Sequence, residues 1–172
     1  MTQTTIHKGP AGVYQDEEQA LDEWKRSMGQ FAAGVTVITA LDAMGRTVGT
    51  TVSAFSSLSL RPRLLLVCLD RRSRTLEAIR HGGCFAVNML AAGEGELALN
   101  FGRKGEDQFA GIAHARGVLG CPLLERVCAR IECRLETIHD GGDHDILIGS
   151  PVRVEVMPEN APLVYYAGRF VP

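Results

Sequence analysis

The chain has 172 residues, of which 45% are hydrophobic and 22% are charged, and its formal net charge at pH 7 is −2. These values are ordinary for a soluble globular protein, and the length allows one domain with its own core. The weak net charge and the lack of a Lys/Arg run argue against nucleic-acid binding. The sequence has no apolar stretch long enough for a membrane span and no signal-peptide core, so we expect a cytoplasmic protein without a membrane partner.

The five cysteines contain no C-x-x-C pair, and they are Cys68, Cys84, Cys121, Cys128 and Cys133. An odd number of cysteines without a pattern is typical of reduced, mostly buried thiols in a cytosolic protein. His139 and His144 flank a Gly-Gly turn, but no His/Cys cluster has the spacing of metal ligands. The sequence therefore predicts no metal site.

The N-terminal region divides into a tail and a helix. Residues 1–14 are polar, which predicts a flexible tail ahead of a single domain over residues 15–172. Asp16 is a suitable N-cap for a helix that ends near residue 30. One face of this helix is apolar and carries Trp24, which we interpret as an anchor in the core.

A hairpin is predicted next, with a strand over 34–41, a turn over 42–45 and a returning stretch over 45–59. Hydroxyls and small residues in the returning stretch replace the large apolar side chains of a core strand. Side chains alternate along a strand, and one face of this stretch carries Thr47, Gly49, Thr51 and Ser53. Such a surface lets a flat ligand approach the backbone. The alternative is an edge strand whose hydroxyls face water.

A charged segment follows the next predicted strand. Residues 64–69 form a continuous apolar run, which predicts a strand buried on both faces. Ser73 is a suitable N-cap for a helix that ends near residue 80. Arg71, Arg72 and Arg74 surround this cap. A helix N-terminus beside arginines attracts an anionic group; the alternative is an ordinary solvated cap.

The second half of the chain is rich in predicted strands. Residues 84–90 form one strand, in which the buried amide of Asn88 must bond either backbone or a ligand. A short helix is predicted over 94–101, and a surface excursion over the site or a dimer partner is predicted over 102–120. Further strands are expected over 127–137, 144–156 and 163–166, with a tight turn at 140–143. Six or seven mostly antiparallel strands with two or three helices predict a mainly β (α+β) fold, and they suggest a small barrel.

Several common enzyme motifs are absent from the sequence. No G-x-G-x-x-G opens a βαβ unit, and neither G-x-x-x-x-G-K-[ST] nor H-E-x-x-H is present. Residues 29–34 contain no G-x-S-x-G nucleophile elbow. If the chain is an enzyme, we expect a cofactor to carry the chemistry.

Three separated patterns form an ordered set: GVTVIT at 34–39, GTTVSAFSSLS at 49–59 followed by Pro62, and GDHDILIG at 142–149 with PLVYYAG at 162–168. SRT at 73–75 and FAVNML at 85–90 lie between them. Over about residues 22–170 this set resembles the flavin-reductase-like family, which comprises short-chain NAD(P)H:flavin oxidoreductases that serve two-component flavin monooxygenases. Many relatives have two prolines after the Ser-rich stretch, whereas here Arg63 follows Pro62.

The resemblance implies a fold and an activity. The fold would be an antiparallel, Greek-key-like, FMN-binding split β-barrel that works as a homodimer. NADH or NADPH would reduce FMN or FAD, and the reduced flavin would diffuse to a separate monooxygenase. We expect NADH rather than NADPH, because no pair of arginines stands out for a 2′-phosphate.

The resemblance also implies the residues of a flavin site. Those at the isoalloxazine edge would be Thr51, Val52, Ser53 and Ala54. Those toward the ribityl phosphate would be Ser57, Ser73 and Thr75, with Arg71 or Arg74 supplying charge. Those beside the flavin at the end of the apolar strand would be Cys68, Leu69 and Asp70, and Asn88 would bond the polar rim.

For the reduced pyridine, the resemblance implies His144, which matches the family's GDH motif and would lie where the nicotinamide stacks. Tyr166 is a second candidate near the same face. Two other functions stay open: a pyridoxamine-phosphate-oxidase-like flavoprotein with permanently bound FMN, and a non-catalytic split barrel that binds flavin or haem.

Overall fold

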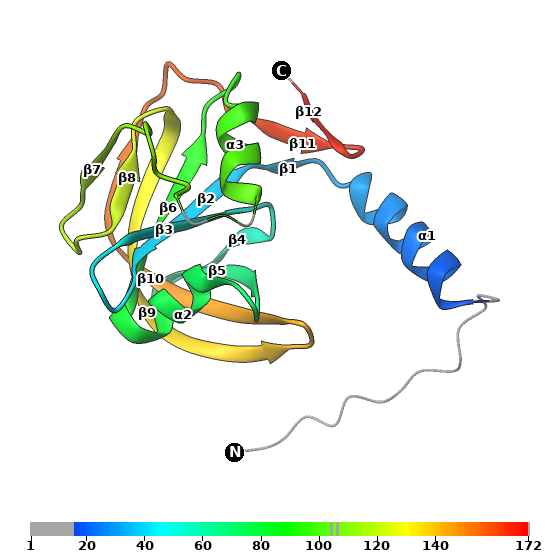
Figure 1. Ribbon diagram of the computed structural model, residues 1–172, viewed down its shortest axis with the longest axis horizontal. Coiled ribbons are helices and arrows are strands. Elements are labelled where there is room, and N and C mark those ends of the chain that lie inside the picture. The colour runs from blue at the N-terminus through cyan, green and yellow to red at the C-terminus, as the bar shows by residue number, and fades with distance from the viewer. Residues whose placement is uncertain (1–15, 104, 106, 172) are drawn as a thin grey trace.

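The computed structural model describes residues 16–103, 105 and 107–171, so the predicted tail over residues 1–14 lies outside the described residues. The described part folds into three helices and twelve strands, all paired antiparallel (Figure 1). In chain order they are α1 (Glu17–Gly29), β1 (Ala33–Gly34), β2 (Thr36–Leu41), β3 (Thr47–Val52), β4 (Phe55–Leu60), β5 (Arg63–Asp70), α2 (Arg74–Gly82), β6 (Cys84–Leu90), α3 (Gly95–Gly102), β7 (His114–Arg116), β8 (Pro122–Leu124), β9 (Val127–Gly141), β10 (His144–Val156), β11 (Val164–Tyr166) and β12 (Arg169–Val171).

Seven of these strands form one curled sheet in the order β3-β2-β6-β9-β10-β5-β4. Its two edge strands, β3 and β4, are separated in sequence only by Ser53 and Ala54. In a flat sheet, six strand spacings of about 4.8 Å would put the edges roughly 29 Å apart, whereas three Cα steps span at most about 11 Å. The sheet must therefore curl until its edges approach each other. At this point the Cys68 N–H donates to the Ala54 carbonyl, 3.0 Å away.

The prediction of one strand over residues 45–59 is wrong. The β2–β3 hairpin forms as expected, but β3 pairs only with β2, and β4 pairs only with β5. The chain thus leaves one edge of the sheet and enters the other edge within two residues. The prediction of a mainly β, antiparallel fold is confirmed.

The hydrophobic core fills the inside of the curl. Its main cluster includes Ile38, Val67, Phe85 and Leu147 from four strands, and Ile79 of α2 covers it. A second cluster lies beneath α3, whose buried residues contact β2 and β8 side chains. The two helices therefore cover separate parts of the curled sheet, and the space between them borders β3 (Figure 1).

Strand β5 is buried on one face only, contrary to the prediction of burial on both. Leu65, Val67 and Leu69 are buried, whereas Leu66 and Cys68 between them are partly exposed. The alternation places a half-exposed, apolar row on the outer face of the sheet.

Helix α1 stands apart from the sheet (Figure 1). Asp16 caps it as predicted, because its side chain accepts a hydrogen bond of 2.7 Å from the Gln19 N–H. The prediction that Trp24 anchors the core is wrong, since no residue of α1 is buried and Trp24 is 62% exposed. The apolar face of α1 therefore has no cover within the described part of the chain.

Strand β9 carries a buried carboxylate at Glu132, which is 1% exposed. It accepts hydrogen bonds from the N–H groups of Val118 and Leu119, at 3.0 and 2.9 Å. The carboxylate thus fixes the loop before β8, a long-range partnership with no local sequence signal.

Candidate functional site

A cavity of about 320 Å³ opens where β3, the start of α2 and the end of α3 meet. Its lining residues are Val48, Gly49, Thr50, Asp70, Arg72, Ser73, Arg74, Thr75, Phe101, Gly102, Arg103 and Gln108. Four residues predicted for the site lie together here: Asp70, Ser73, Arg74 and Thr75. This volume lies within the range of small-molecule sites, about 300–1,000 Å³.

Strand β3 contributes its backbone edge to the cavity. It is an edge strand hydrogen-bonded on its β2 side, and an edge strand has amides and carbonyls free on its other side. A flat ligand with a polar rim can bond such an edge.

The small residues of β3 also allow α3 to pack closely against this strand. A Cβ on Gly49 would lie 2.9 Å from the Phe101 ring, so only glycine admits that ring. The Thr51 hydroxyl donates a hydrogen bond of 2.6 Å to the Ala98 carbonyl of α3. Part of the small-residue pattern interpreted as a ligand-binding surface therefore packs against α3. The Thr51 hydroxyl is already bonded to this helix.

The start of α2 is suited to an anion. Ser73 occupies the N-cap, yet its side chain makes no cap hydrogen bond. The first N–H groups of a helix without a side-chain cap can bind an anion. Arg72 and Arg74 flank the cap, and Arg103 lines the cavity from the end of α3.

Among the described residues that line this cavity, Asp70 is the one carboxylate, and Arg72 neutralises it. Their guanidinium–carboxylate distance is 2.8 Å, and the Arg72 N–H also donates to Asp70 at 2.7 Å. These hydrogen bonds from Arg72 hold the pKa of Asp70 well below its ordinary value. The cavity lining keeps a net positive charge from Arg74 and Arg103, so a phosphate-bearing ligand is favoured over a cation.

His144 lies beside this cavity, because it is the residue opposite Asp70 in the β10–β5 ladder. Directly opposed residues project from the same face of a sheet. Its Nδ1 lies 2.7 Å from the Asp143 carboxylate, and its side chain is 44% exposed. The hydrogen bond to His144 lowers the pKa of Asp143. The imidazole is thus oriented by its neighbour and open to a ligand.

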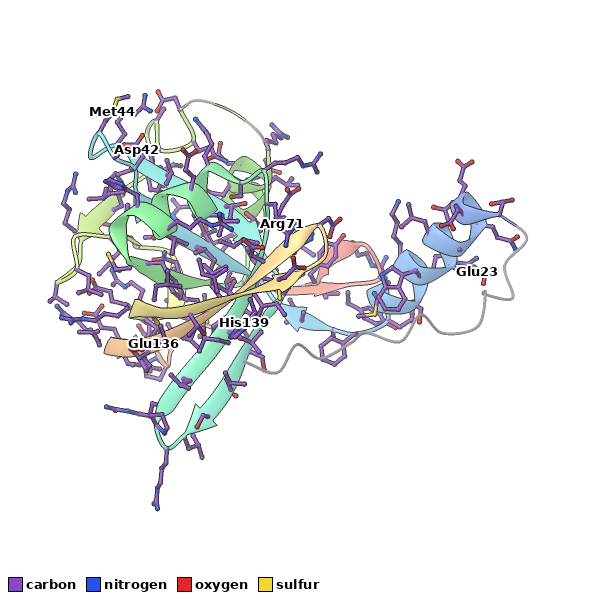
Figure 2. The ribbon with its side chains drawn as sticks, turned by 90° about the horizontal axis from the view of Figure 1, so that it is seen from below. Glu23, Asp42, Met44, Arg71, Glu136 and His139 are labelled. Carbon is purple, nitrogen blue, oxygen red and sulfur yellow. The ribbon has the colours of Figure 1, made fainter. Side chains whose placement is uncertain are left out.

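Arg71 does not line the 320 Å³ cavity. Its Nε donates to the Asp145 carboxylate at 3.0 Å, and its other end pairs with Asp140. Asp145 is buried and also pairs with Arg80 of α2. Figure 2 shows Arg71 beside the β9–β10 hairpin. Arg71 therefore clamps this hairpin to the end of β5, which keeps His144 next to Asp70.

Asn88 belongs to the core rather than to an open site. It is fully buried, and its amide nitrogen donates to the Val37 carbonyl and the Thr39 hydroxyl, both at 3.1 Å. Its carbonyl oxygen accepts from the Leu124 N–H at 2.8 Å. Of the two partners considered for this amide, protein groups satisfy it, and the proposed bond to the flavin rim is not supported.

Other predicted residues are dispersed. Val52 and Leu69 are core residues. Ser53, Ala54 and Cys68 lie together where the sheet edges approach each other.

The last two residues predicted for the site, Ser57 and Tyr166, lie elsewhere. Ser57 is exposed on β4, and Tyr166 on β11 bonds the Gln30 side chain at 3.1 Å. The described residues therefore concentrate the predicted set on two neighbouring places: the start of α2 and the Asp70–His144 pair.

The sequence did not single out the residues at the end of α3. Gln108 fixes this end, because its side-chain nitrogen donates to the Phe101 and Arg103 carbonyls at 3.2 and 2.8 Å. Arg103 could have been suspected only from the expectation that residues 102–120 cover the site. Arg72 belongs to the predicted run of arginines around Ser73, but the family resemblance did not assign it to the phosphate.

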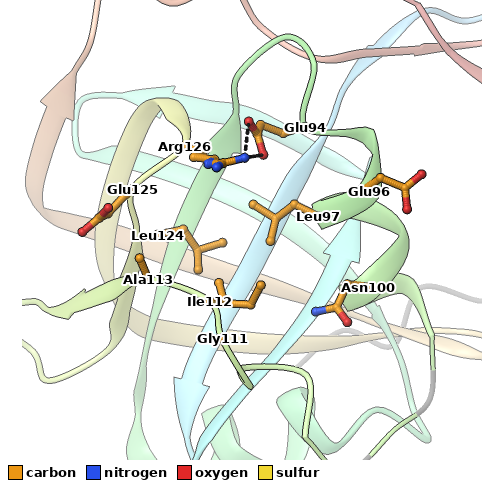
Figure 3. A pocket seen from close by; sticks show the side chains of 10 residues that line it. All are labelled: Glu94, Glu96, Leu97, Asn100, Gly111, Ile112, Ala113, Leu124, Glu125 and Arg126. Carbon is orange, nitrogen blue, oxygen red and sulfur yellow. Dashed lines mark hydrogen bonds and ion pairs between the residues drawn. The ribbon is translucent and has the colours of Figure 1, made fainter.

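A larger cavity of about 450 Å³ lies at the N-terminal part of α3 (Figure 3). Leu97, Ile112 and Leu124 form an apolar floor, and Glu96 and Glu125 lie on the rim. It contains no residue predicted for the site. Carboxylates repel a phosphate, so the smaller cavity is the better candidate despite its size.

Metal and membrane features are not found in the described part of the chain. Residues 16–103, 105 and 107–171 contain no group of three or more His, Cys, Asp or Glu side chains that could hold a metal ion. None of the three helices has the length and apolar character needed to cross a bilayer.

Comparison with known proteins adds a family match. The model of the flavin reductase like domain matches residues 28–172. The chain is 39% identical over 154 residues to the flavin-dependent monooxygenase reductase subunit HsaB of Rhodococcus jostii, covering 88% of this chain and 78% of that protein. It is 40% identical over 146 residues to a protein named probable flavin reductase from Rhizobium meliloti, covering 85% of this chain but only 47% of that protein.

A solved structure is also similar. The NADH:FAD oxidoreductase SgcE6 of Streptomyces globisporus, in complex with NAD and FAD fragments, superimposes with a TM-score of 0.85. It is 28% identical to this chain, and the match covers 93% of this chain and 96% of that one.

Proposed function

The chain belongs to the flavin reductase like domain family, and from this premise we propose that it reduces FMN or FAD with NADH or NADPH and supplies the reduced flavin to a separate flavin-dependent monooxygenase. The names of two similar proteins support this proposal: one is a monooxygenase reductase subunit and the other is an NADH:FAD oxidoreductase. The enzyme is accordingly an oxidoreductase.

The observation that carries the proposal is the cationic cavity beside the free edge of β3. A flavin nucleotide is a flat ring with a polar rim and a phosphate tail. The β3 edge suits the rim, and the uncapped start of α2 with Arg72 and Arg74 suits the phosphate. The residues present therefore fit this group.

When bound, the flavin accepts a hydride from the reduced pyridine and carries the electrons away. The chain itself has three tasks in this proposal. The backbone from Thr51 to Ala54 bonds the rim of the ring, Ser73, Arg74 and Thr75 hold the phosphate, and His144 orients the dinucleotide. Amide donors at the rim stabilise negative charge on the reduced ring. No protein nucleophile is required.

Finer features of the proposal concern fold and assembly. The curled sheet with neighbouring edges supports a split β-barrel. Three exposed apolar features support a homodimer: the uncovered apolar face of α1 with Trp24 62% exposed, Phe31 just beyond the helix at 74% exposed, and the half-exposed outer row of β5. The free cysteines among the described residues support a cytoplasmic location.

The test is consumption of the reduced pyridine by purified protein with no flavin, FMN or FAD, first with NADH and then with NADPH. We expect a protein that oxidises NADH faster than NADPH and only when flavin is added. A protein that is yellow from tightly bound flavin and oxidises neither NADH nor NADPH would overturn the proposal. Oxidation of an amine substrate by such a protein would indicate an oxidase instead.

A further inference from the structure

Two free thiols lie in contact on the side of β6 that faces β8. The sulfur atoms of Cys84 and Cys121 are 3.7 Å apart. Cys84 is the first residue of β6, and Cys121 directly precedes β8. Neither lines the two cavities described above, and the proposed hydride transfer uses neither. The pair is therefore an oxidisable dithiol without a role in the proposed function.

The two thiols differ in access. Cys84 is partly exposed, whereas Cys121 is 1% exposed. Burial raises the pKa of Cys121 far above its ordinary value, so this sulfur stays protonated near neutral pH. A small oxidant in solution therefore reaches Cys84 first, and Cys121 lies beneath it as a resolving thiol.

The local backbone allows the two sulfurs to bond. A disulfide requires about 2.05 Å between sulfurs, so the pair must approach by about 1.7 Å from its present 3.7 Å. Gly120, with a φ of +81°, directly precedes Cys121. The Gly117 N–H bonds the Cys121 carbonyl at 3.0 Å. The proposed bond requires side-chain rotation together with a small adjustment of this turn.

We propose that Cys84 and Cys121 are a peroxide-sensitive pair that forms an intramolecular disulfide. Hydrogen peroxide first oxidises the Cys84 sulfur to a sulfenic acid and releases one water. The Cys121 sulfur then attacks the Cys84 sulfur, an S–S bond forms, and the sulfenic oxygen leaves as a second water with the Cys121 proton. Two thiols are oxidised by two electrons in total, and one peroxide is reduced to two waters.

The source of the oxidant, unlike the thiol chemistry, depends on the proposed function: free reduced flavin that no partner consumes reduces dioxygen to hydrogen peroxide. The pair would then record reductase turnover that is not coupled to a monooxygenase. The chemistry of the pair itself needs only peroxide.

The sequence makes the pair easy to observe. Cleavage after Lys and Arg places each cysteine on its own peptide, namely 64–71, 81–103, 117–126, 127–130 and 131–134. Reduced native protein is desalted, treated with hydrogen peroxide, alkylated under denaturing conditions, digested with trypsin and analysed by mass spectrometry. We expect peptide 81–103 linked to peptide 117–126, a link that dithiothreitol reverses, and an intact mass lower by about 2 Da.

Matched variants separate the pair from the other thiols. Cys84→Ser should abolish the link, whereas Cys128→Ser, which removes another partly buried thiol, should retain it. Because Cys84 is partly exposed, its serine variant should keep the fold, which its melting temperature checks. In wild type the link should raise the melting temperature by several degrees, because it closes a long loop in the unfolded chain.

A turnover arm tests the oxidant source: NADH and FMN in air should form the same link, and catalase should prevent it. The experiment with added peroxide measures the link between Cys84 and Cys121 whether or not the protein oxidises NADH. Native wild-type protein in which added peroxide links other cysteines, or leaves Cys84 over-oxidised without a link, overturns the proposal.

Discussion

His144 and Asp70 are partners in the β10–β5 ladder, so the imidazole is held beside the cavity that contains Asp70, Ser73 and Arg74. This pairing joins the β9–β10 turn to the start of α2, two segments about 70 residues apart in sequence. In the proposed reductase it brings the residue assigned to the pyridine nucleotide next to the residues assigned to the flavin phosphate.

Replacing His144 tests this assignment. His144→Ala should lower kcat/KM for NADH roughly tenfold, mainly through KM, because one orienting contact is worth about 1.4 kcal/mol. Steady-state kinetics at saturating FMN measures the change. His139→Ala is the matched control, since His139 lies opposite Ile146 on the same hairpin. Unchanged NADH kinetics in His144→Ala would remove His144 from the site.

Arg74 should discriminate flavins by their phosphate. Arg74→Gln should raise the KM for FMN roughly tenfold and leave that for riboflavin unchanged, because riboflavin has no phosphate for the guanidinium to bind. The comparison of the two flavins is an internal control for folding. Glu96→Gln in the larger cavity should alter neither value. An equal rise for both flavins would contradict the assignment of Arg74 to the phosphate.

Gly49 should not tolerate a side chain. Gly49→Ala places a Cβ 2.9 Å from the Phe101 ring, which should cost about 1–3 kcal/mol in the free energy of unfolding and displace the end of α3 that lines the cavity. Urea unfolding measures the first effect and FMN titration the second. Gly34→Ala, whose Cβ would meet nothing within 4 Å, should change both much less.

The ion pairs of Asp145 with Arg71 and Arg80 should stabilise the fold and hold His144 in position. Asp145→Ala leaves Arg71 and Arg80 without their buried partner and should cost about 2 kcal/mol, less than a fully buried pair because both arginines are about half exposed. Chemical denaturation tests this, and a raised KM for NADH should accompany it. Asp22→Asn, which removes an exposed pair on α1, should change stability by less than about 0.5 kcal/mol.

Acid should weaken the turn before α2. Arg72 lowers the pKa of Asp70 in the folded state, so this pair contributes stability at pH values above the ordinary Asp value of about 4. The contribution is lost as the pH falls through the lower, folded-state pKa. Unfolding curves from pH 7 to pH 2 should show a smaller acid-dependent loss in Asp70→Asn. Arg72→Gln should show the same reduction, and an unaltered profile in both would reject the pairing.

The sequence predicted elements that have strong local signals. Gly82 and Gly83 mark the end of α2 and the start of β6, and Gly141 ends β9 just before the β9–β10 turn at Gly142. By contrast, Ser53 and Ala54 resemble the strand residues around them, so nothing local marked the change of sheet edge. The apolar stripe on α1 predicted burial, but a sequence pattern does not specify the surface that provides it.

The site was predictable where charge and capping residues cluster, as at Ser73 and Arg74. It was not predictable where distant segments meet. The Thr51 hydroxyl bonds a carbonyl 47 residues away on α3, and Asn88 is satisfied by β2 and β8. A polar residue in an apolar strand is equally consistent with a ligand or with such a partner, and only the tertiary structure separates the two.

The two-residue connection at Ser53 and Ala54 also determines the order in which the sheet can assemble during synthesis. Translation first yields two adjacent hairpins, β2–β3 and β4–β5, which do not pair with each other. The strands that lie between them, β6, β9 and β10, come from residues 84–156. A ribosome-bound nascent chain therefore exposes two hairpins whose neighbouring strands have not yet been made, and unpaired strand edges of this kind favour aggregation until the C-terminal half emerges.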